Sequence, residues 1–422
     1  MTIALIDGNN FYAACEQSID PSLVDQPLVV LSNNDGCIIS RNAEAKAFGI
    51  PMGAPFFKVR TKLKQYGVKI RSSNYALYGD MSERFMNLIK NYCEELEIYS
   101  IDEAFVNIKR PMNCNLHPWA KELRTHIYQN LSLPIAIGIG ATKTQAKLAN
   151  YLAKKVADTA GIFDLEISKH QEDWLESIAV ENVWGIGHKM AQWCRLRGIN
   201  NALQLRDAPS HELKAKLGIT GIRLQNELKG VRCIPFAKYN KAKKETCVSR
   251  SFNKPITTMD ELRQAISSYA VRASEKLRKQ NQVAGIITIF TRTSLHKATF
   301  YSKSASKRLK SHSNDTSILL NASLALTPEI FKQNLPLIKA GVIMQDLQED
   351  KHLQLHLFET YNSQSTMQRK VLMKTIDNLN QRYGSNTVRW TAYGTSPTWS
   401  MRRKYLSPSA TTRLTDIPIV IS

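Results

Sequence analysis

Tyr99-Ser100-Ile101-Asp102-Glu103-Ala104 is the stretch of sequence that decides the fold. Apolar residues flank it, with Ile98 before and Phe105-Val106 after it, so the sequence predicts a strand that carries two adjacent carboxylates. Burying two like charges side by side costs on the order of several kcal/mol unless a cation compensates them. A bound metal ion is the usual compensation, so Asp102 and Glu103 are candidate metal ligands.

A third carboxylate follows a second strand-like run. Asp7 ends the apolar run Ile3-Ala4-Leu5-Ile6 and is followed by Gly8-Asn9-Asn10-Phe11-Tyr12. An isolated Asp at the end of a strand is more often a helix cap than a ligand. Together with Asp102 and Glu103, Asp7 would complete three carboxylates on two neighbouring strands, which suffice for a two-metal phosphoryl-transfer site.

The overall charge favours a polyanionic partner. The 422 residues predict about two to four domains, and 57 Lys and Arg against 36 Asp and Glu give a formal charge of +21. The excess is uneven, because the segment 241–310 holds 16 basic and 4 acidic residues. Nucleic acid is the leading candidate partner, and a basic protein without such a partner is the alternative.

Cysteine usage and apolar runs indicate the compartment. Seven cysteines form an odd number with no Cys-x-x-Cys pair, which argues against a disulfide framework and against a structural zinc site. The start of the sequence lacks a secretory pattern, and the longest apolar runs, such as 133–141, are far shorter than a membrane span. We therefore expect a cytoplasmic protein with no membrane partner.

The first part of the chain has the periodicity of an α+β domain. Residues 38–64 show a helical pattern broken by Gly and Pro. The order of elements suggests a ferredoxin-like palm with an insertion at roughly residues 20–77. We expect strands over 2–6, 27–31 and 135–139, helices over 11–17, 81–96 and 116–131, and the acidic strand between the last two helices.

Gly138-Ile139-Gly140 lacks the spacing of a phosphate loop, so we interpret these glycines as the end of a strand. Lys147 and Lys154 are seven residues apart on the following helix and share one face of it. Helical lysines are usually solvated, so only the context makes Lys154 a phosphate ligand.

A glycine-rich hairpin is predicted between two helical stretches, at Val183-Trp184-Gly185-Ile186-Gly187-His188-Lys189. Such a hairpin exposes backbone amides at a helix N-terminus, where they can hold a DNA phosphate without reading sequence. Gly185, Gly187 and Lys189 are therefore candidate DNA contacts, and a tight turn between helices is the alternative.

A short basic linker at 239–245 separates a second α/β domain, which carries most of the basic segment. A basic sheet that binds the backbone of duplex DNA would lose affinity as the salt concentration rises, through counterion release. A basic face that is only solvated is the alternative. Arg250 is a candidate DNA contact of this domain. We expect strands over 246–252, 283–291 and 342–347 and helices over 258–279 and 328–337.

After residue 350 the pattern weakens, but Gln354-Leu355-His356-Leu357-Phe358 is an apolar cluster between polar flanks. Such a peptide could anchor Leu355, Leu357 and Phe358 in the groove of a partner, although a buried strand looks the same. A helix over 368–381 and a polar tail with Trp390, Tyr393 and Trp399 suggest a small accessory region.

Five spaced motifs together resemble the Y-family translesion DNA polymerases, and the nearest branch is that of UmuC, the catalytic subunit of DNA polymerase V, with MucB, ImpB and RumB. The match runs the length of the chain and in order. The motifs are Asp7 with Asn10-Phe11-Tyr12, Arg41-Asn42-Ala43-Glu44-Ala45-Lys46 followed by Phe48-Gly49, Ser100-Ile101-Asp102-Glu103, Ala146-Lys147-Leu148-Ala149, and Val183-Trp184-Gly185-Ile186-Gly187.

The resemblance implies an α+β right-hand polymerase with a ferredoxin-like palm, small fingers, a helical thumb with a helix-hairpin-helix, and an α/β little finger. It implies error-prone, template-directed translesion synthesis in SOS mutagenesis, with dNTP and primer-template DNA as substrates. The implied boundaries are 1–20 and 78–165 for the palm, 21–77 for the fingers, 166–238 for the thumb, 239–245 for the linker, 246–350 for the little finger, and 351–422 for a tail with a clamp-binding peptide.

The resemblance also implies the roles of the site residues. Asp7, Asp102 and Glu103, with the backbone carbonyl of Gly8, would bind two Mg²⁺ ions that activate the primer 3′-hydroxyl and neutralise the triphosphate. Tyr12 matches the steric gate against ribose, and Phe11 belongs to the same wall.

Lys46 and Lys154 would contact the triphosphate, although many family members have Tyr and Arg where this chain has Ala43 and Lys46, and a Lys cannot reproduce a bidentate Arg. The resemblance further implies docking on the sliding clamp through Gln354, Leu355, Leu357 and Phe358, a processed UmuD′-type dimer as partner, and activation by a RecA filament.

Two alternatives remain at this point. A palm-fold nucleotidyl cyclase could use the same carboxylates, but it would need neither the glycine hairpin nor the basic second domain. A non-catalytic DNA-binding checkpoint protein would occupy stalled primer ends, and the intact carboxylates argue against it.

Overall fold

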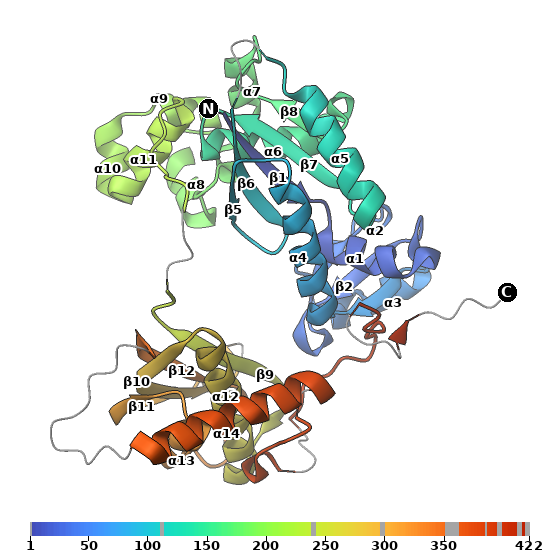
Figure 1. The fold of residues 1–422 in the computed structure, drawn as a ribbon. Helices are drawn as coiled ribbons and strands as arrows, with labels where there is room; N and C mark the ends of the chain where they lie inside the picture. Colours follow the sequence, from blue (N-terminus) through green and yellow to red (C-terminus); the bar gives the residue numbers. More distant parts are fainter. Residues whose placement is uncertain are drawn as a thin grey trace. The chain divides into compact units, whose positions relative to one another are not determined.

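The computed structural model of the chain describes residues 2–109, 114–237, 242–295, 300–350, 363–384, 386–394, 399–411 and 416–417. The chain forms two compact units (Figure 1). Unit 1 consists of Met1–Asn240 together with Lys404–Ser422, and unit 2 consists of Lys241–Arg403. The predicted clamp peptide at 354–358 lies outside the described residues.

Unit 1 is built on a five-stranded sheet, which we call the large sheet. Its central strand, β1 (Thr2–Gly8), pairs antiparallel with β6 (Glu103–Ile108) and with β7 (Ile135–Gly140). β5 (Glu95–Ile98) and β8 (Ile162–Asp164) form the edges, in the order β5-β6-β1-β7-β8. Every residue of β1 is buried, because helices cover both faces of this sheet.

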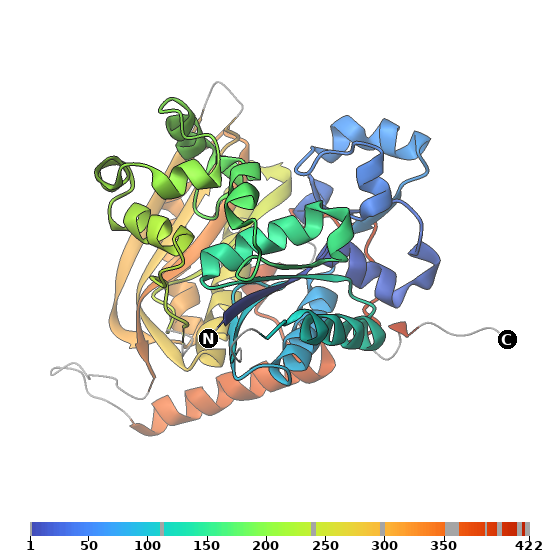
Figure 2. The ribbon, with the colours of Figure 1, turned by 90° about the horizontal axis from the view of Figure 1, so that it is seen from above.

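The helices of unit 1 divide between the two faces of the large sheet (Figure 2). α1 (Phe11–Ile19), α4 (Tyr75–Lys90) and α5 (His117–Leu131) share an apolar core on one face. α6 (Lys143–Lys155) packs against the other face. The side chains of β1 alternate between these two cores, as strand geometry requires.

A three-stranded sheet, the small sheet, follows α1 in the chain. Its order is β3-β2-β4, so β4 is an edge strand. The prediction of a broken helical pattern from residue 38 is wrong for β3, because alternate side chains of this segment are buried in the sheet. The elements are η1 (Pro21–Leu23), β2 (Leu28–Leu31), η2 (Asn33–Asp35), β3 (Ile38–Arg41), α2 (Ala43–Ala47), α3 (Phe56–Gln65) and β4 (Lys69–Ser72).

A group of short helices completes unit 1 before the chain enters unit 2 (Figure 1). These helices share one apolar core with α6, so α6 packs on the large sheet with one side and on the short helices with the other. They are α7 (Gln171–Ser177), η4 (Val180–Asn182), α8 (His188–Arg195), α9 (Ala202–Asp207), α10 (Ser210–Leu217) and α11 (Ile219–Leu228). η3 (Ala157–Thr159) lies between α6 and β8.

Unit 2 is a four-stranded antiparallel sheet with two helices on one face. The strand order is β11-β10-β12-β9, and α12 and α13 bury one face of these strands in a single apolar core. The elements are β9 (Thr246–Ile256), α12 (Met259–Lys279), β10 (Gln282–Arg292), β11 (Ser302–Ser313), α13 (Thr316–Ile330), β12 (Leu337–Glu349), α14 (Ser363–Tyr383) and η5 (Thr391–Tyr393).

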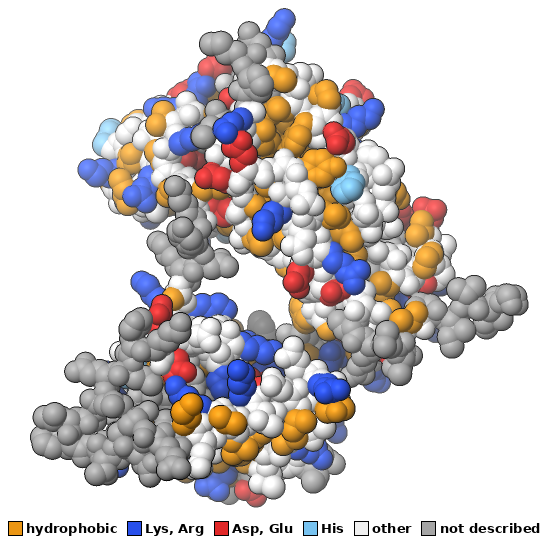
Figure 3. Space-filling model, viewed as in Figure 1, with side chains coloured by type: hydrophobic (Ala, Val, Ile, Leu, Met, Phe, Trp, Pro, Cys, Tyr) orange, Lys and Arg blue, Asp and Glu red, His pale blue; other side chains and the backbone are white. Residues whose placement is uncertain are grey.

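The opposite face of this sheet, which we call the open face, is polar and basic. Ile287 and Ile289 of β10 point into the helical core, so Thr288, Phe290 and the residues paired with them lie on the open face. Arg292 and its partner Lys339 share this face, as does Arg308 of β11. Lys and Arg side chains also gather on the face of unit 2 seen in Figure 3.

α14 is attached to unit 2 by two paired arginine–carboxylate contacts. Arg278 of α12 donates two hydrogen bonds to Asp377 of α14, at 2.6 and 2.7 Å. Arg369 of α14 donates two to Asp315, which caps α13, also at 2.6 and 2.7 Å. Bidentate pairs of this kind combine two charge-assisted hydrogen bonds with a fixed geometry, so they orient α14 on α12 and α13.

Several element predictions need correction. The predicted helix over 328–337 is wrong, because α13 ends at Ile330 and Pro328 lies near its end. The predicted helix over 81–96 is shifted, since α4 begins at Tyr75 and residues 95–98 form β5. β11 was not predicted. The predicted acidic strand through 98–106 is wrong for residues 99–102, which form the turn between β5 and β6, so Asp102 lies in this turn and Glu103 begins β6. The other predicted strands and helices are confirmed, with boundaries that differ by a few residues. Within the described ranges, no helix is long and apolar enough to cross a membrane.

Candidate active site

The three predicted carboxylates come from adjoining ends of β1 and β6. Asp7 lies directly opposite Glu103 in the antiparallel register of these strands. The backbone N–H of Gly8 donates to the carbonyl of Asp102 at 2.8 Å, which ties the end of β1 to the turn before β6. A Cβ on Gly8 would approach the ring of Phe11 to 3.0 Å, so the close passage of the chain suits glycine there.

Ser100 organises the turn that presents the acidic pair. Its hydroxyl donates to Oδ1 of Asp102 at 2.6 Å and accepts from the backbone N–H of Glu103 at 3.0 Å. A short side chain that bonds to nearby backbone is the usual means of fixing such a turn. The orientation of Asp102 is therefore set before any ligand binds.

Two lysines of α6 reach the carboxylates. Nζ of Lys154 lies 2.7 Å from Oδ1 of Asp7, and Nζ of Lys147 lies 3.1 Å from Oε2 of Glu103. α6 can come this close because β7 has no side chain at Gly138, where a Cβ would lie 2.0 Å from the backbone nitrogen of Asn150. The glycines that resembled a phosphate loop thus permit a close helix–strand contact.

The surroundings of Asp7 raise the pKa of its carboxyl group. Burial raises the pKa of Asp7 to about 7, Lys154 lowers it, and the charge and hydrogen bond of Glu103 raise it further. A carboxylate whose ionised form is disfavoured in this way gains stabilisation from an added cation. The charge of Lys154 therefore does not fully compensate the carboxylate of Asp7, and an additional cation would stabilise its ionised form.

Lys147 also connects the site to the predicted glycine hairpin. Its ammonium group lies 4.4 Å from the ring centre of Tyr99 and 5.5 Å from that of Trp184. The indole N–H of Trp184 donates to the hydroxyl of Tyr99 at 3.2 Å. Trp184 immediately precedes Gly185, so the hairpin is packed against the turn that carries the acidic pair.

The predicted gate residues lie on α1. The ring of Tyr12 stacks on that of Tyr78, with centroids 4.5 Å apart and planes 17° apart, and meets the edge of Tyr75 at 6.1 Å. Burial, Tyr75 and the nearby carboxylate of Asp102 raise the pKa of Tyr12. Phe11 is buried in the core beside Phe85, and its ring centroid lies 6.1 Å from that of Tyr12.

Three cations gather near the same end of the large sheet. Burial and the charges of Arg41 and Lys154 lower the pKa of Lys46, so both of these charges lie within electrostatic reach of Lys46. Lys46 comes from α2 and Arg41 from β3, whereas Lys154 comes from α6. Sequence reasoning quoted Arg41 within a motif but gave it no role.

The predicted DNA contacts occupy two different units. In unit 1, Gly185 has a φ of 91°, which favours glycine, and Gly187 caps the N-terminus of α8, where Lys189 is exposed. In unit 2, Arg250 is half-buried in β9 and lies beside Lys276 of α12, so it faces the helices and not the open face.

No three His, Cys, Asp or Glu side chains are grouped closely enough to hold a metal ion within the part of the chain that the structure describes. At Asp7 and Glu103 the oxygens are instead paired with the two lysines of α6. The oxygen ligands themselves are of the type that Mg²⁺ prefers. They fit the ion if Lys154 is displaced from Asp7.

The chain is similar to known proteins along nearly its whole length. Residues 6–151 match the impB/mucB/samB family and residues 243–357 match the C-terminal domain of that family. The chain is 38% identical to "Protein UmuC" of Salmonella typhimurium over 98% of this chain and 99% of that protein. It is 35% identical to "Protein MucB" of Escherichia coli over 99% of both. This chain belongs to the impB/mucB/samB family.

Membership of this family confirms the resemblance to the UmuC branch. The fold is confirmed by a solved structure, a Y-family DNA polymerase chimera, which superposes with a TM-score of 0.65 at 20% identity and covers 82% of this chain and 99% of that one. Residues 370–420 match a domain of unknown function, DUF4113. This family member is an α+β right-hand polymerase of the Y family.

Proposed function

We propose that this chain, a Y-family DNA polymerase that carries out error-prone translesion synthesis, transfers the nucleotide at the site formed by Asp7, Asp102 and Glu103. The register that sets Asp7 opposite Glu103, with Asp102 tied to Gly8, is the observation that carries the proposal. A nucleotidyl cyclase would explain these carboxylates but not the basic sheet of unit 2.

Two Mg²⁺ ions are the proposed cofactors, held by the three carboxylates and the carbonyl of Gly8. When bound, they would lower the pKa of the primer hydroxyl and neutralise the charge of the triphosphate. The raised pKa of Asp7 supports this, because its buried carboxylate is short of positive charge. Ser100 keeps Asp102 in place for its ligand role.

Lys154 and Lys46 are the proposed triphosphate ligands, with Arg41 as a third cation. Lys154 is partly exposed and can exchange Asp7 for a phosphate oxygen without leaving its helix. Arg41 adds the planar, forked donor group that the two lysines lack. Its presence supports a phosphate grip that does not depend on Lys46 alone.

Tyr12 is the proposed steric gate. Its ring is stacked on Tyr78, and Asp102 is among the groups that shift its pKa, so the ring lies on the metal side of α1. Gly185, Gly187 and Lys189 remain proposed DNA contacts, but Arg250 does not, because it lies on the helical face of the sheet of unit 2. Phe11 supports the ring of Tyr12 from the core, at a centroid distance of 6.1 Å.

Three protein partners and the location complete the proposal. A sliding clamp would bind Gln354, Leu355, Leu357 and Phe358, and a UmuD′-type dimer and a RecA filament would act as in the UmuC branch. A chain lacking residues 354–358 that kept its clamp-dependent processivity would remove this peptide from the proposal. The odd number of cysteines supports a cytoplasmic, reducing compartment.

Primer extension across an abasic site tests the carboxylate assignment. We expect Asp102→Ala to abolish extension while leaving DNA binding in a mobility-shift assay intact, because the substitution removes a ligand and not a basic residue. Asp173→Ala, on the exposed surface of α7, is the matched control and should extend normally. Equal extension by wild type and Asp102→Ala would overturn the assignment.

A further inference from the structure

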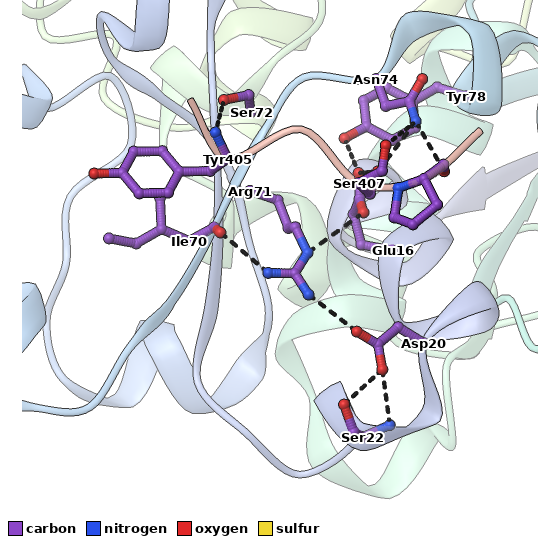
Figure 4. A network of polar contacts seen from close by, with 11 residues as sticks. Glu16, Asp20, Ser22, Ile70, Arg71, Ser72, Asn74, Tyr78, Tyr405 and Ser407 are labelled. Carbon is purple, nitrogen blue, oxygen red and sulfur yellow. Dashed lines mark hydrogen bonds and ion pairs between the residues drawn. The ribbon is translucent and has the colours of Figure 1, made fainter. Parts of the chain in front are cut away.

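Residues 404–408, which we call the strap, return from unit 2 to unit 1 and bind along its small sheet (Figure 4). The backbone N–H of Ser72, at the end of edge strand β4, donates to the carbonyl of Tyr405 at 2.8 Å. The backbone N–H of Tyr405 donates back to the hydroxyl of Ser72 at 2.9 Å. The strap thus pairs with the edge of the small sheet.

Two more contacts hold the first half of the strap. The carboxylate of Asp35, which is buried, accepts from the hydroxyl of Ser72 at 2.5 Å and from the backbone N–H of Lys404 at 3.0 Å. The ring of Tyr405 meets that of Phe56 edge-on at 6.0 Å, within the core of the small sheet. The strap is therefore packed onto unit 1 by hydrogen bonds to buried polar groups and by an apolar ring contact.

The second half of the strap reaches the helices of the large sheet. The hydroxyl of Ser407 donates to Oε1 of Glu16 at 3.1 Å and accepts from the side-chain amide of Asn74 at 3.0 Å. Glu16 belongs to α1, and Asn74 caps the N-terminus of α4. The strap therefore bridges the small sheet to two helices that cover the large sheet.

Glu16 connects the strap to the residues that surround Tyr12. Its side chain is fully buried, and its Oε1 atom also accepts from the hydroxyl of Tyr78 at 2.7 Å. Tyr78 is the residue on which the ring of Tyr12 stacks. Tyr12 and Glu16 are four residues apart on α1, so they share one helix face. Figure 4 shows Tyr78 and Ser407 converging on Glu16.

We propose that Ser407 is a positioning residue for sugar selection. Through Glu16 and Tyr78, the strap fixes the orientation of the Tyr12 ring, and it also holds the small sheet against α1 and α4. The inference rests on the proposed role of Tyr12 as a steric gate. It also gives a role to part of residues 370–420, the region matched by the domain of unknown function.

The direct test compares single-nucleotide insertion of a dNTP and of the matching rNTP by the full chain. Ser407→Ala leaves Glu16 with one hydroxyl donor fewer and loosens Tyr78. We expect the preference for dNTP over rNTP in kcat/KM to fall roughly threefold to tenfold, as is usual for coupled networks. Ser407→Thr, which keeps the hydroxyl, should restore the preference, and Ser400→Ala, at an exposed serine, should not change it.

Two further variants separate this inference from the gate itself. Tyr78→Phe should lower sugar discrimination as Ser407→Ala does, and the double variant should show little added loss because both act through Glu16. Tyr12→Ala is measured in parallel. If Tyr12→Ala changes sugar selection and Ser407→Ala does not, the strap inference is overturned; if Tyr12→Ala changes nothing, the gate assignment is wrong.

Hydrogen exchange tests the seating of the strap without enzyme activity. In the wild-type chain we expect the backbone amides of Ser72 and Tyr405 to be protected, since each donates to the other residue. Exchange of both amides at unprotected rates in the wild type would overturn the inference. Faster exchange at both positions in Ser407→Ala would support it.

Discussion

Tyr12 is fixed from several sides before any nucleotide arrives. Tyr78 stacks beneath its ring, Tyr75 meets it edge-on, and Phe11 holds it from the core. In the proposed gate role, a ring held in this way would exclude the 2′-hydroxyl of a ribonucleotide by steric contact, which needs no hydrogen bond. Its effect on sugar choice should therefore depend on the size of the side chain more than on its polarity.

The corresponding prediction concerns Tyr12→Ala and Tyr12→Phe. We expect Tyr12→Ala to reduce the discrimination between dNTP and rNTP by roughly tenfold or more, because it opens space for the 2′-hydroxyl. Tyr12→Phe keeps the ring and is the control. Single-nucleotide insertion kinetics measure both, and loss of discrimination in Tyr12→Phe as large as in Tyr12→Ala would contradict a steric mechanism.

At the scale of single residues, the sequence predicted that Asp102 and Glu103 lie at a site with a compensating cation, because two adjacent acids among apolar residues need an opposite charge. It also placed Lys147 and Lys154 on one helix face, although not their contacts with Glu103 and Asp7. It could not predict Glu16. This residue lies in a polar-looking run of α1, and its partners at positions 78 and 407 are far away in sequence.

The capping carboxylate of α13 links two helices of unit 2. Burial raises the pKa of Asp315, but the hydrogen bonds and charge of Arg369, together with the N–H groups of Ser317 and Ile318, outweigh it and lower the pKa. A lowered carboxyl pKa gives stability that is present above the unfolded pKa of about 3.9 and is lost as the pH falls through the folded pKa.

Asp315→Asn should therefore destabilise the chain more at neutral pH than in acid. Asn caps a helix about as well as Asp, so the cap survives and only the charge is lost. We expect a loss on the order of 1 kcal/mol at pH 7, since Arg369 is half-exposed, and a smaller loss at pH 3, below the unfolded pKa. Thermal unfolding of the full chain at both pH values measures this.

Asp260→Asn, at an exposed position in the first turn of α12, is the control for that experiment and should have a smaller effect. Equal destabilisation by Asp315→Asn at both pH values would show that the contact is one of packing and not of charge.

Element predictions succeeded where apolar residues recur with a clear period. β1, β10 and β12 were found because buried strands are apolar. β11 was missed because it is an edge strand of Ser, Lys and Arg, most of whose residues are exposed. α13 was misplaced because Pro328, which is typical of helix starts, here lies near the helix end.

At the scale of the whole molecule, the net positive charge predicts that DNA affinity depends on salt concentration. If the open face of unit 2 contacts phosphates, the logarithm of the binding constant should fall linearly with the logarithm of the salt concentration. Each phosphate contact contributes about 0.9 to the slope on duplex DNA. Removing three cations from that face should therefore lower the slope by roughly two to three.

The test replaces Arg292, Arg308 and Lys339 by alanine and measures duplex affinity over a range of salt concentrations. The control removes the same charge from α12, on the helical face, with Arg272, Lys276 and Lys279 replaced by alanine. An equal change of slope in both triple variants would show that net charge alone governs binding, and would remove the open face as the contact surface.

The strap also constrains how the protein is made. Unit 1 contains residues from both sides of unit 2, since Lys404–Ser422 belongs with Met1–Asn240. During synthesis, which runs from the N-terminus, all of unit 2 must leave the ribosome before Ser407 can reach Glu16. Until then the Glu16 side chain keeps, among the described residues, its contacts with Tyr78 and Arg71, and β4 lacks its contact with the strap. A chain that ends before residue 404 would therefore keep the three carboxylates but lack the strap contact to Glu16, and with it the proposed support for the ring of Tyr12.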